Sequence, residues 1–102
     1  MKRSYLALDL GAESGRAMIA HLTGGKVEFA ELHRFANTPV RLPTGLYWDT
    51  LRLFHEMCEG IRAAAKAVER LDGVAVDTWG VDFGLLGADG SLLDNPRHYR
   101  DA

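Results

Sequence analysis

Residues 9–16 combine an acid with a glycine-containing turn, a pattern that can bind phosphate and a metal ion. They read Asp-Leu-Gly-Ala-Glu-Ser-Gly-Arg and lie between two apolar runs. A glycine turn between two strands can aim backbone N–H groups at an anion, because glycine tolerates positive φ and lets a ligand approach closely. An acid at the end of a strand can hold Mg²⁺, usually through water. Asp9 and the turn therefore predict a site for the phosphate tail of a nucleotide and its magnesium ion.

Other phosphate-binding loops fit this turn less well. A Rossmann fingerprint needs G-x-G-x-x-G opening a helix, whereas Gly11 and Gly15 are separated by three residues and a strand is expected next. A P-loop needs a lysine directly after its last glycine, and Arg16 stands there instead. From spacing alone, an ordinary hairpin with a five-residue loop is an equally good interpretation.

A second polar strand end follows the run 74–79. It reads Asp77-Thr-Trp-Gly-Val-Asp82. Asp77 lies inside an apolar strand, so it is either structural or at a cleft, since buried carboxylates need partners. Asp82 could instead cap a turn, and Trp79 could be a core aromatic. Open sheets with parallel strands bind ligands at the carboxyl ends of those strands.

Three strands are expected to hold the first turn in place. The ranges 4–10, 16–23 and 26–36 form an antiparallel meander, with Gly24-Gly25 as a hairpin signal. Alternation on the third strand predicts a shared face for Val27, Phe29, Glu31, His33 and Phe35.

An amphipathic helix is expected to connect the meander to the second polar strand end. Residues 37–48, with Pro39 and Pro43, are expected to be irregular. Asp49 is a good N-cap for a helix over 50–71, about 33 Å long, with Gly73 as the C′ glycine. The predicted core face of the helix consists of Leu51, Phe54, Cys58, Ile61, Ala65 and Val68. This crossover would make the strand at 74–79 parallel to the first strand. The two polar strand ends should then open onto a common crevice. A further strand is expected over 81–86.

Length and composition indicate one globular domain. The chain has 102 residues, 47% hydrophobic residues and a net charge of −2. This balance gives no reason to expect a nucleic acid or a membrane surface as a partner. Cys58 is the only cysteine, so no intrachain disulfide is possible, and no apolar run is long enough to span a membrane. These features favour a cytoplasmic protein.

The pattern resembles a known family, the FGGY carbohydrate kinases, specifically their N-terminal lobe. The fold implied is α/β, a ribonuclease H-like or actin-like ATPase half-domain with a mixed sheet, and residues 1–102 would be part of that lobe. The passages that carry the resemblance are residues 9–16, His33-Arg-Phe-Ala-Asn37, Trp48-Asp49, and residues 77–83 with Tyr99-Arg-Asp101.

The resemblance implies ATP-dependent phosphorylation of a sugar in the presence of Mg²⁺. The passage 77–83 is similar to members that act on the C1 hydroxyl of L-rhamnulose, in L-rhamnose catabolism. By similarity, the loop on the ATP phosphates would consist of Ala12, Glu13, Ser14, Gly15 and Arg16. Asp9 would lie near the metal. The residues near the sugar would be Gly80, Trp79, Asp82 and Tyr99.

Two features depart from the family pattern. Glu13 replaces the usual Ser or Thr, and a carboxylate beside a triphosphate would repel it, so its side chain should either point away or face the metal. Members of the family have two lobes, and their catalytic aspartate and adenine pocket would lie beyond residue 102. The chain is therefore expected to be an N-terminal fragment that is inactive alone. Its partners would be sugar, nucleotide and the remainder of the kinase, and self-association through exposed apolar surface is expected.

Three alternatives remain open from the sequence. One is an FGGY kinase for a different ketose or polyol. Another is a binding module that keeps the fold without the chemistry. The last is an actin- or chaperone-type ATPase, which residues 77–83 disfavour because such proteins need no sugar pocket.

Overall fold

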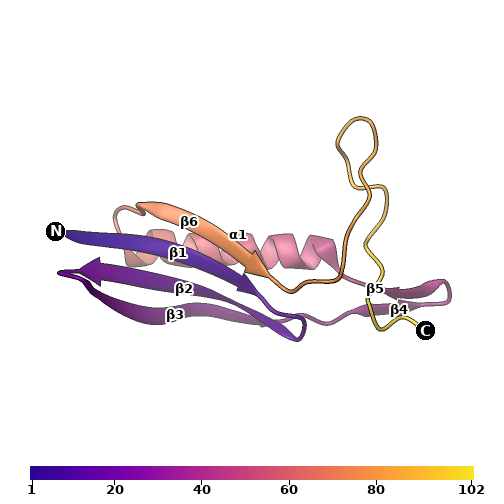
Figure 1. The fold of residues 1–102 in the computed structure, drawn as a ribbon, viewed down its shortest axis with the longest axis horizontal. Helices are drawn as coiled ribbons and strands as arrows, with labels where there is room; N and C mark the ends of the chain where they lie inside the picture. Colours follow the sequence, from indigo (N-terminus) through magenta and orange to yellow (C-terminus); the bar gives the residue numbers. More distant parts are fainter.

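The computed structural model describes residues 1–102 as a four-stranded mixed sheet with one helix against one face (Figure 1). The order in the sheet is β3-β2-β1-β6, and β1 is antiparallel to β2 and parallel to β6. The predicted meander, crossover helix and parallel strand are confirmed. The bounds are β1 Lys2–Leu10, β2 Ser14–Thr23, β3 Lys26–Ala36, β4 Val40–Leu42, β5 Gly45–Tyr47, α1 Thr50–Ala67 and β6 Gly73–Thr78.

Helix α1 begins as predicted and ends earlier. The Asp49 side chain accepts a hydrogen bond from the backbone N–H of Arg52, as an N-cap does. The helix has 18 residues, so it is about 27 Å long. Val68 is extended, and Asp72 exchanges hydrogen bonds with Ser4 of β1, which draws the connection onto the sheet. The predicted end at residue 71 is therefore wrong, and Gly73 starts β6 instead of capping the helix.

The face of α1 that packs on the sheet is not the predicted one. Leu53, Gly60 and Ala64 are its buried residues. Leu51 is 80% exposed and Phe54 is 66% exposed. The close approach of the helix to the sheet selects the buried face, because a Cβ on Gly60 would lie 2.7 Å from the Cβ of Ala17. The helix thus approaches the sheet through its small residues. Of the predicted face, Val68, just beyond the helix, packs against the core, whereas Leu51, Phe54 and Ile61 are exposed and Cys58 is half-buried.

A β-bulge in β3 changes the predicted alternation. Met18 pairs with Glu31 and Ala17 pairs with His33, so Leu32 has no partner on β2. An extra residue reverses the side-chain alternation beyond it. Phe29 consequently faces away from the helix, whereas His33 reaches Glu56 on α1, with Nε2 and Oε2 2.7 Å apart. The prediction of one shared face along β3 is wrong for this reason.

The segments outside the main sheet also differ from the predictions. Residues 40–47, expected to be irregular, form the β4–β5 hairpin, where the Tyr47 hydroxyl donates to the Thr44 hydroxyl. Residues 81–86 do not form a strand, and only Leu86 bridges to Leu92. This segment stands away from the sheet and returns to pair Arg97 with Tyr47 (Figure 1).

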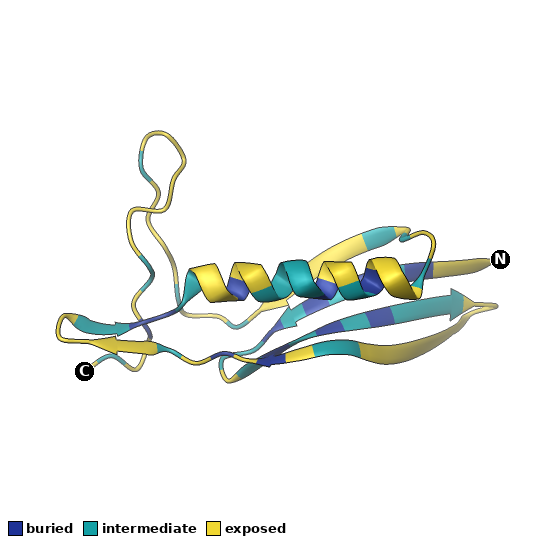
Figure 2. Ribbon diagram, turned by 180° about the vertical axis from the view of Figure 1, so that it is seen from behind, coloured by how far each residue is buried: buried dark blue, intermediate teal, exposed yellow.

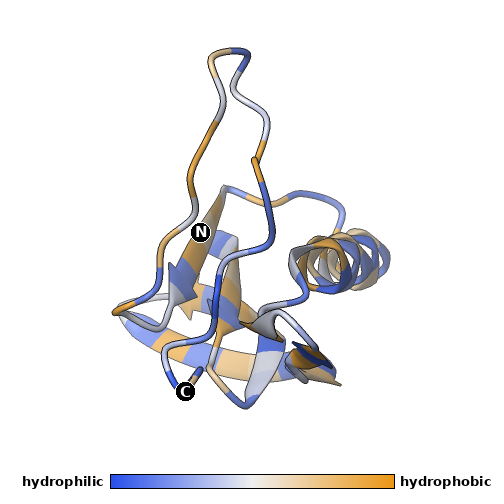
Figure 3. Cartoon of the chain, turned by 90° about the vertical axis from the view of Figure 1, so that its right-hand side faces the viewer, coloured by the Kyte–Doolittle hydropathy of each residue, from blue (hydrophilic) through white to orange (hydrophobic).

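The core lies between the sheet and α1, as the buried residues in Figure 2 show. Its main cluster joins Leu6, Leu8, Ala17, Ile19 and Ala64. Strand β6 is almost wholly exposed, because α1 covers only β1, β2 and β3. Figure 3 shows the helix to one side of the curved sheet and the segment after β6 projecting from both. The single helix, α1, does not combine the length and the apolar character needed to cross a membrane.

Candidate functional site

The turn between β1 and β2 is tighter than the sequence indicates. It consists of Gly11, Ala12 and Glu13, because β2 already begins at Ser14, so Gly15 and Arg16 lie in the strand. The glycines serve close packing, since neither has a positive φ. A Cβ on Gly11 would lie 2.6 Å from the Ser14 carbonyl oxygen, and one on Gly15 would lie 2.2 Å from the Phe35 ring. The turn therefore connects an ordinary β-hairpin, and it also contains backbone N–H groups without a protein acceptor.

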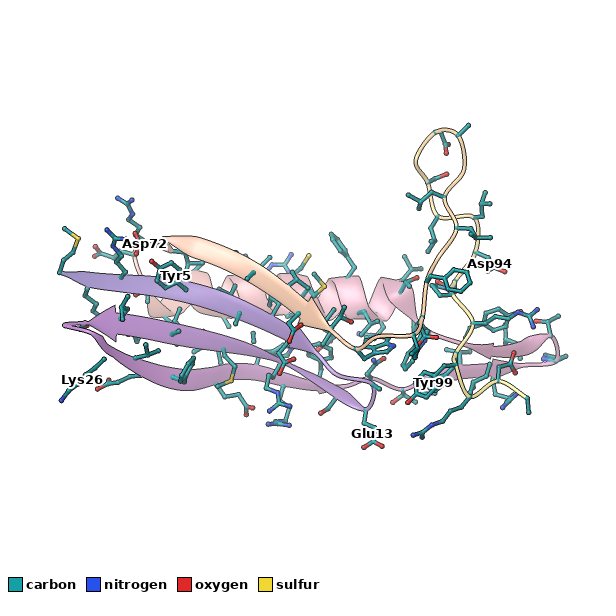
Figure 4. The ribbon with its side chains drawn as sticks, in the orientation of Figure 1. Tyr5, Glu13, Lys26, Asp72, Asp94 and Tyr99 are labelled. Carbon is teal, nitrogen blue, oxygen red and sulfur yellow. The ribbon has the colours of Figure 1, made fainter.

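Backbone donors in this turn are available to a ligand. The Gly11 N–H donates to the Ser14 carbonyl, which closes the turn. The N–H groups of Ala12 and Glu13 donate to no protein group. The Glu13 side chain extends from the tip of the turn into solvent (Figure 4). Its carboxylate therefore points away from the sheet, as expected, while the amides remain accessible to an anion.

Asn37 braces the turn, a role that sequence reasoning missed. Its backbone N–H donates to the Glu13 carbonyl at 3.0 Å, and its side-chain Nδ2 donates to the Gly11 carbonyl at 2.9 Å. The residue is buried. The signal in the sequence was an asparagine directly after a strand, where its amide can bond to nearby backbone.

Charged residues form a row across the sheet next to the turn. Asp9 pairs with Asp77 on β6 and with Arg16 on β2, and Arg16 pairs with Arg34 on β3. Paired residues share a face, here the face opposite α1. Arg16 Nε and Asp9 Oδ2 are 3.4 Å apart, and Arg16 Nε is buried without a hydrogen bond. A hollow of about 380 Å³ includes Asp9, Arg16 and Asp77 in its lining.

The bend after β6 is held by a bond within it. Trp79 Nε1 donates to Asp82 Oδ2 at 2.6 Å. Between them, Val81 has a φ of 71°, a left-handed conformation that is rare for a β-branched residue. Backbone strain of this kind occurs preferentially at functional sites. Gly80 is exposed, and a Cβ there would contact nothing within 4 Å.

Aromatic rings support this bend from the hairpin side. Trp48 is buried and packs against Trp79, with ring centroids 4.3 Å apart. His98 stacks on Trp48 at 4.1 Å, and Tyr99 stacks on His98 at 4.7 Å. Trp48 is thus a packing residue. Tyr99 lies at the outer end of the stack (Figure 4), beside neither of the hollows that contain Asp82.

Asp82 lines two hollows on the far side of the bend. One, of about 310 Å³, lies between the hairpin and the projecting segment and includes Tyr47, Phe83 and Arg97. The other, of about 170 Å³, includes Trp48 and Trp79. Carboxylate, guanidinium and aromatic groups together are suited to a polar ligand with apolar faces.

The carboxyl ends of β1 and β6 lie side by side, as expected for parallel strands joined by a crossover helix. Leu10 pairs with Thr78 on the neighbouring parallel strand, so the chain leaves both strands at one edge of the sheet. The hollow that includes Asp9 and Arg16 is separate from the two hollows at the bend after β6, and no residue of the turn between β1 and β2 lines any of the three. The expected neighbouring positions of the two strand ends are therefore confirmed, whereas the expected common crevice is not, because the hollows do not join.

The carboxylates fit a magnesium ion that is coordinated mainly by water and phosphate. No group of three or more His, Cys, Asp or Glu side chains is arranged to hold a metal by itself. Mg²⁺ is commonly bound through one or two carboxylates and substrate phosphates. Asp9, with Asp77 on the adjacent strand, supplies such a pair.

Comparison with known proteins shows similarity to rhamnulokinases along the whole chain. The rhamnulokinase of Bacteroides thetaiotaomicron is 40% identical over 101 residues, which cover 99% of this chain and 21% of that protein. The rhamnulokinase of Enterococcus faecalis is 41% identical over 101 residues, which cover 98% of this chain and 20% of that protein. The rhamnulokinase of Bacillus subtilis is 36% identical over 97 residues, which cover 95% of this chain and 20% of that protein. The chain spans about a fifth of the length of these relatives. No family model matches it.

Solved structures share the fold at low sequence identity. A gluconate kinase from Lactobacillus acidophilus superposes with a TM-score of 0.76 at 15% identity, over 95% of this chain and 20% of that one. A xylulose kinase from the same organism gives a TM-score of 0.75 at 15% identity, over 93% and 19%. The fold matches the N-terminal half-domain of FGGY kinases, as predicted from the sequence.

Proposed function

We propose that this chain, a homologue of the rhamnulokinases over its whole length, supplies the phosphate turn and part of the sugar site of an ATP-dependent kinase. The acceptor is the C1 hydroxyl of L-rhamnulose, and the enzyme is cytoplasmic. The observation that carries the proposal is the pairing of Leu10 with Thr78, which brings the two polar bends to one edge of the sheet. Phosphoryl transfer depends mainly on positioning and on charge neutralisation, so donor and acceptor groups must meet in this way.

The nucleotide side of the proposal rests on the turn. The accessible N–H groups of Ala12 and Glu13 bind phosphate oxygens, together with the backbone of Ser14 and Gly15. The Arg16 guanidinium lies next to Asp9 and adds positive charge. Asp9 faces the magnesium ion, which when bound neutralises charge on the phosphates.

The sugar side of the proposal rests on the bend after β6. Trp79 offers an apolar ring, Asp82 a carboxylate, and Gly80 an open approach to the backbone. Tyr99 contributes an outer aromatic face, 43% exposed in this structure. The proton-accepting aspartate and the adenine pocket are assigned to no residue of the chain. We accordingly expect residues 1–102 alone to catalyse no sugar-dependent ADP release.

An FGGY kinase with another sugar is the second candidate. A gluconate kinase and a xylulose kinase are among the solved structures that share the fold. A non-catalytic binding module of the same fold is a further alternative, and it would bind neither nucleotide phosphate nor sugar at these bends.

A titration followed by backbone NMR tests the proposal. Addition of ADP with Mg²⁺ should shift the amide resonances of Ala12 and Glu13. Addition of L-rhamnulose should shift the Trp79 indole resonance more than xylulose or gluconate does. A larger response to xylulose or gluconate favours the second candidate. No response at the turn to saturating ADP, with the fold intact, contradicts the nucleotide part of the proposal.

A further inference from the structure

Asn37 connects to the turn from a third strand. It follows β3 directly, two strands away from β1, and only 5% of its surface is exposed. Its two hydrogen bonds reach the carbonyls of Gly11 and Glu13, the first and last residues of the turn. The backbone bond is available to any residue at this position, whereas the side-chain bond needs an amide or another donor of matching length.

The side-chain bond of Asn37 determines which way the Ala12 N–H points. A peptide unit is planar and trans, so its C=O and N–H point in opposite directions. The Gly11 carbonyl belongs to the same peptide unit as the Ala12 N–H. Because Asn37 holds that carbonyl, the Ala12 N–H is directed away from Asn37 and donates to no protein group. The same argument applies to the Glu13 carbonyl and the Ser14 N–H.

We propose that Asn37 is a positioning residue that holds the phosphate turn in its anion-binding conformation. This inference rests on the proposed role of the turn in nucleotide binding. Asn37 need not touch the nucleotide. Without its side chain the Gly11 peptide unit is free to rotate, and the Ala12 N–H is no longer preorganised for a phosphate oxygen.

Two substitutions separate the bond from the shape of the side chain. Asn37→Ala removes the donor and leaves the Gly11 carbonyl without its partner. Asn37→Asp keeps the shape but places a carboxylate oxygen against the Gly11 carbonyl oxygen. Ser4→Ala is a matched control, because Ser4 is also buried and its hydroxyl bonds to His21 Nδ1 at the opposite end of the sheet.

The experiment combines amide hydrogen exchange with titration by ADP and Mg²⁺. In Asn37→Ala we expect faster exchange at the Gly11 N–H, which closes the turn by donating to the Ser14 carbonyl. We also expect about tenfold weaker ADP binding, the factor typical of one lost hydrogen bond. Asn37→Asp should weaken binding at least as much. Ser4→Ala should leave both quantities at the wild-type value, even if it lowers the global stability. This contrast separates positioning from general destabilisation.

The possible outcomes separate this inference from the proposed function. If the wild-type chain binds ADP and Asn37→Ala binds it equally well, the positioning role is overturned and the proposed function stands. If the wild-type chain does not bind ADP, the proposed function fails. The role of Asn37 in holding the turn is then judged from amide hydrogen exchange in the turn alone. Equal exchange at the Gly11 N–H in Asn37→Ala and Ser4→Ala then overturns the inference. If Asn37→Ala does not fold, Asn37→Asp is judged by the same two measurements.

Discussion

Close packing between Gly15 and Phe35 ties the start of β2, next to the β1–β2 turn, to β3. The Phe35 ring is buried and occupies the place where a Cβ on residue 15 would lie, 2.2 Å from its Cζ atom. We expect Gly15→Ala to lower the free energy of unfolding by about 1–3 kcal/mol, the range for overpacking a rigid site. Urea denaturation measures this.

Gly80→Ala is the matched control, since a Cβ at residue 80 meets nothing within 4 Å. It should change the stability by less than about 0.5 kcal/mol. Equal stability of the two variants would contradict the packing argument.

The ion pair between Glu31 and Arg34 gives a pH prediction at the residue scale. A hydrogen bond from Arg34, helped by its charge and that of Arg16, holds the pKa of Glu31 below its ordinary value. The pair therefore stabilises the fold at pH values above the ordinary pKa of glutamate, and this contribution is lost as the pH falls through the lowered pKa. In Arg34→Gln, an NMR titration should show the pKa of Glu31 rising towards its ordinary value. An unchanged pKa would show that Arg34 is not the cause.

At the scale of elements, α1 has two apolar stripes and only one is covered. Leu53 is 8% exposed and packs with Leu10 and Phe35, whereas Leu51 is 80% exposed. We expect Leu53→Ala to destabilise the protein by about 2–4 kcal/mol through a lost core side chain. Leu51→Ala, the same chemical change two residues away, should cost less than about 0.5 kcal/mol. Thermal or urea unfolding checks both, and similar losses would indicate that the flank is buried in solution.

At the scale of the whole molecule, the chain is extended and leaves apolar surface open. Its radius of gyration is 16.1 Å, against about 13 Å for a compact domain of this length. Val74 and Val76 of the edge strand β6 are each 54% exposed, beside a helix flank that exposes Phe54 and Ile61. Such an edge, without lysine, proline or bulge, favours pairing with another chain.

We therefore expect the 102-residue chain to self-associate as its concentration rises. Val76→Lys should reduce the association, because a lysine on an edge strand opposes edge-to-edge pairing. Sedimentation velocity over a range of concentrations measures both proteins. Val27→Lys, an exposed position far from β6 on β3, is the control and should associate like the wild-type chain. A chain that stays monomeric at high concentration would contradict the prediction.

Local signals determined most of the elements. Gly24-Gly25 placed the hairpin, Asp49 placed the start of α1, and the crossover rule made β6 parallel to β1. These depend on backbone conformation and connection handedness, which neighbouring residues encode. The resemblance carried by residues 77–83 led to the family that the comparisons then support.

Contacts between distant residues decided the rest. Periodicity shows that α1 is amphipathic, but the fit of Gly60 against Ala17 selects the buried face. A bulge at Leu32 depends on the pairing of β3 with β2 and reverses the faces that alternation predicts. Asn37 reaches the turn only because β3 ends beside it. The sequence by itself determined the four strands of the main sheet, the start of α1 and where the polar strand ends fall, but not the β4–β5 hairpin. The tertiary structure alone decided which faces are buried and what braces the turn, because these depend on atoms far apart in the chain meeting at contact distance.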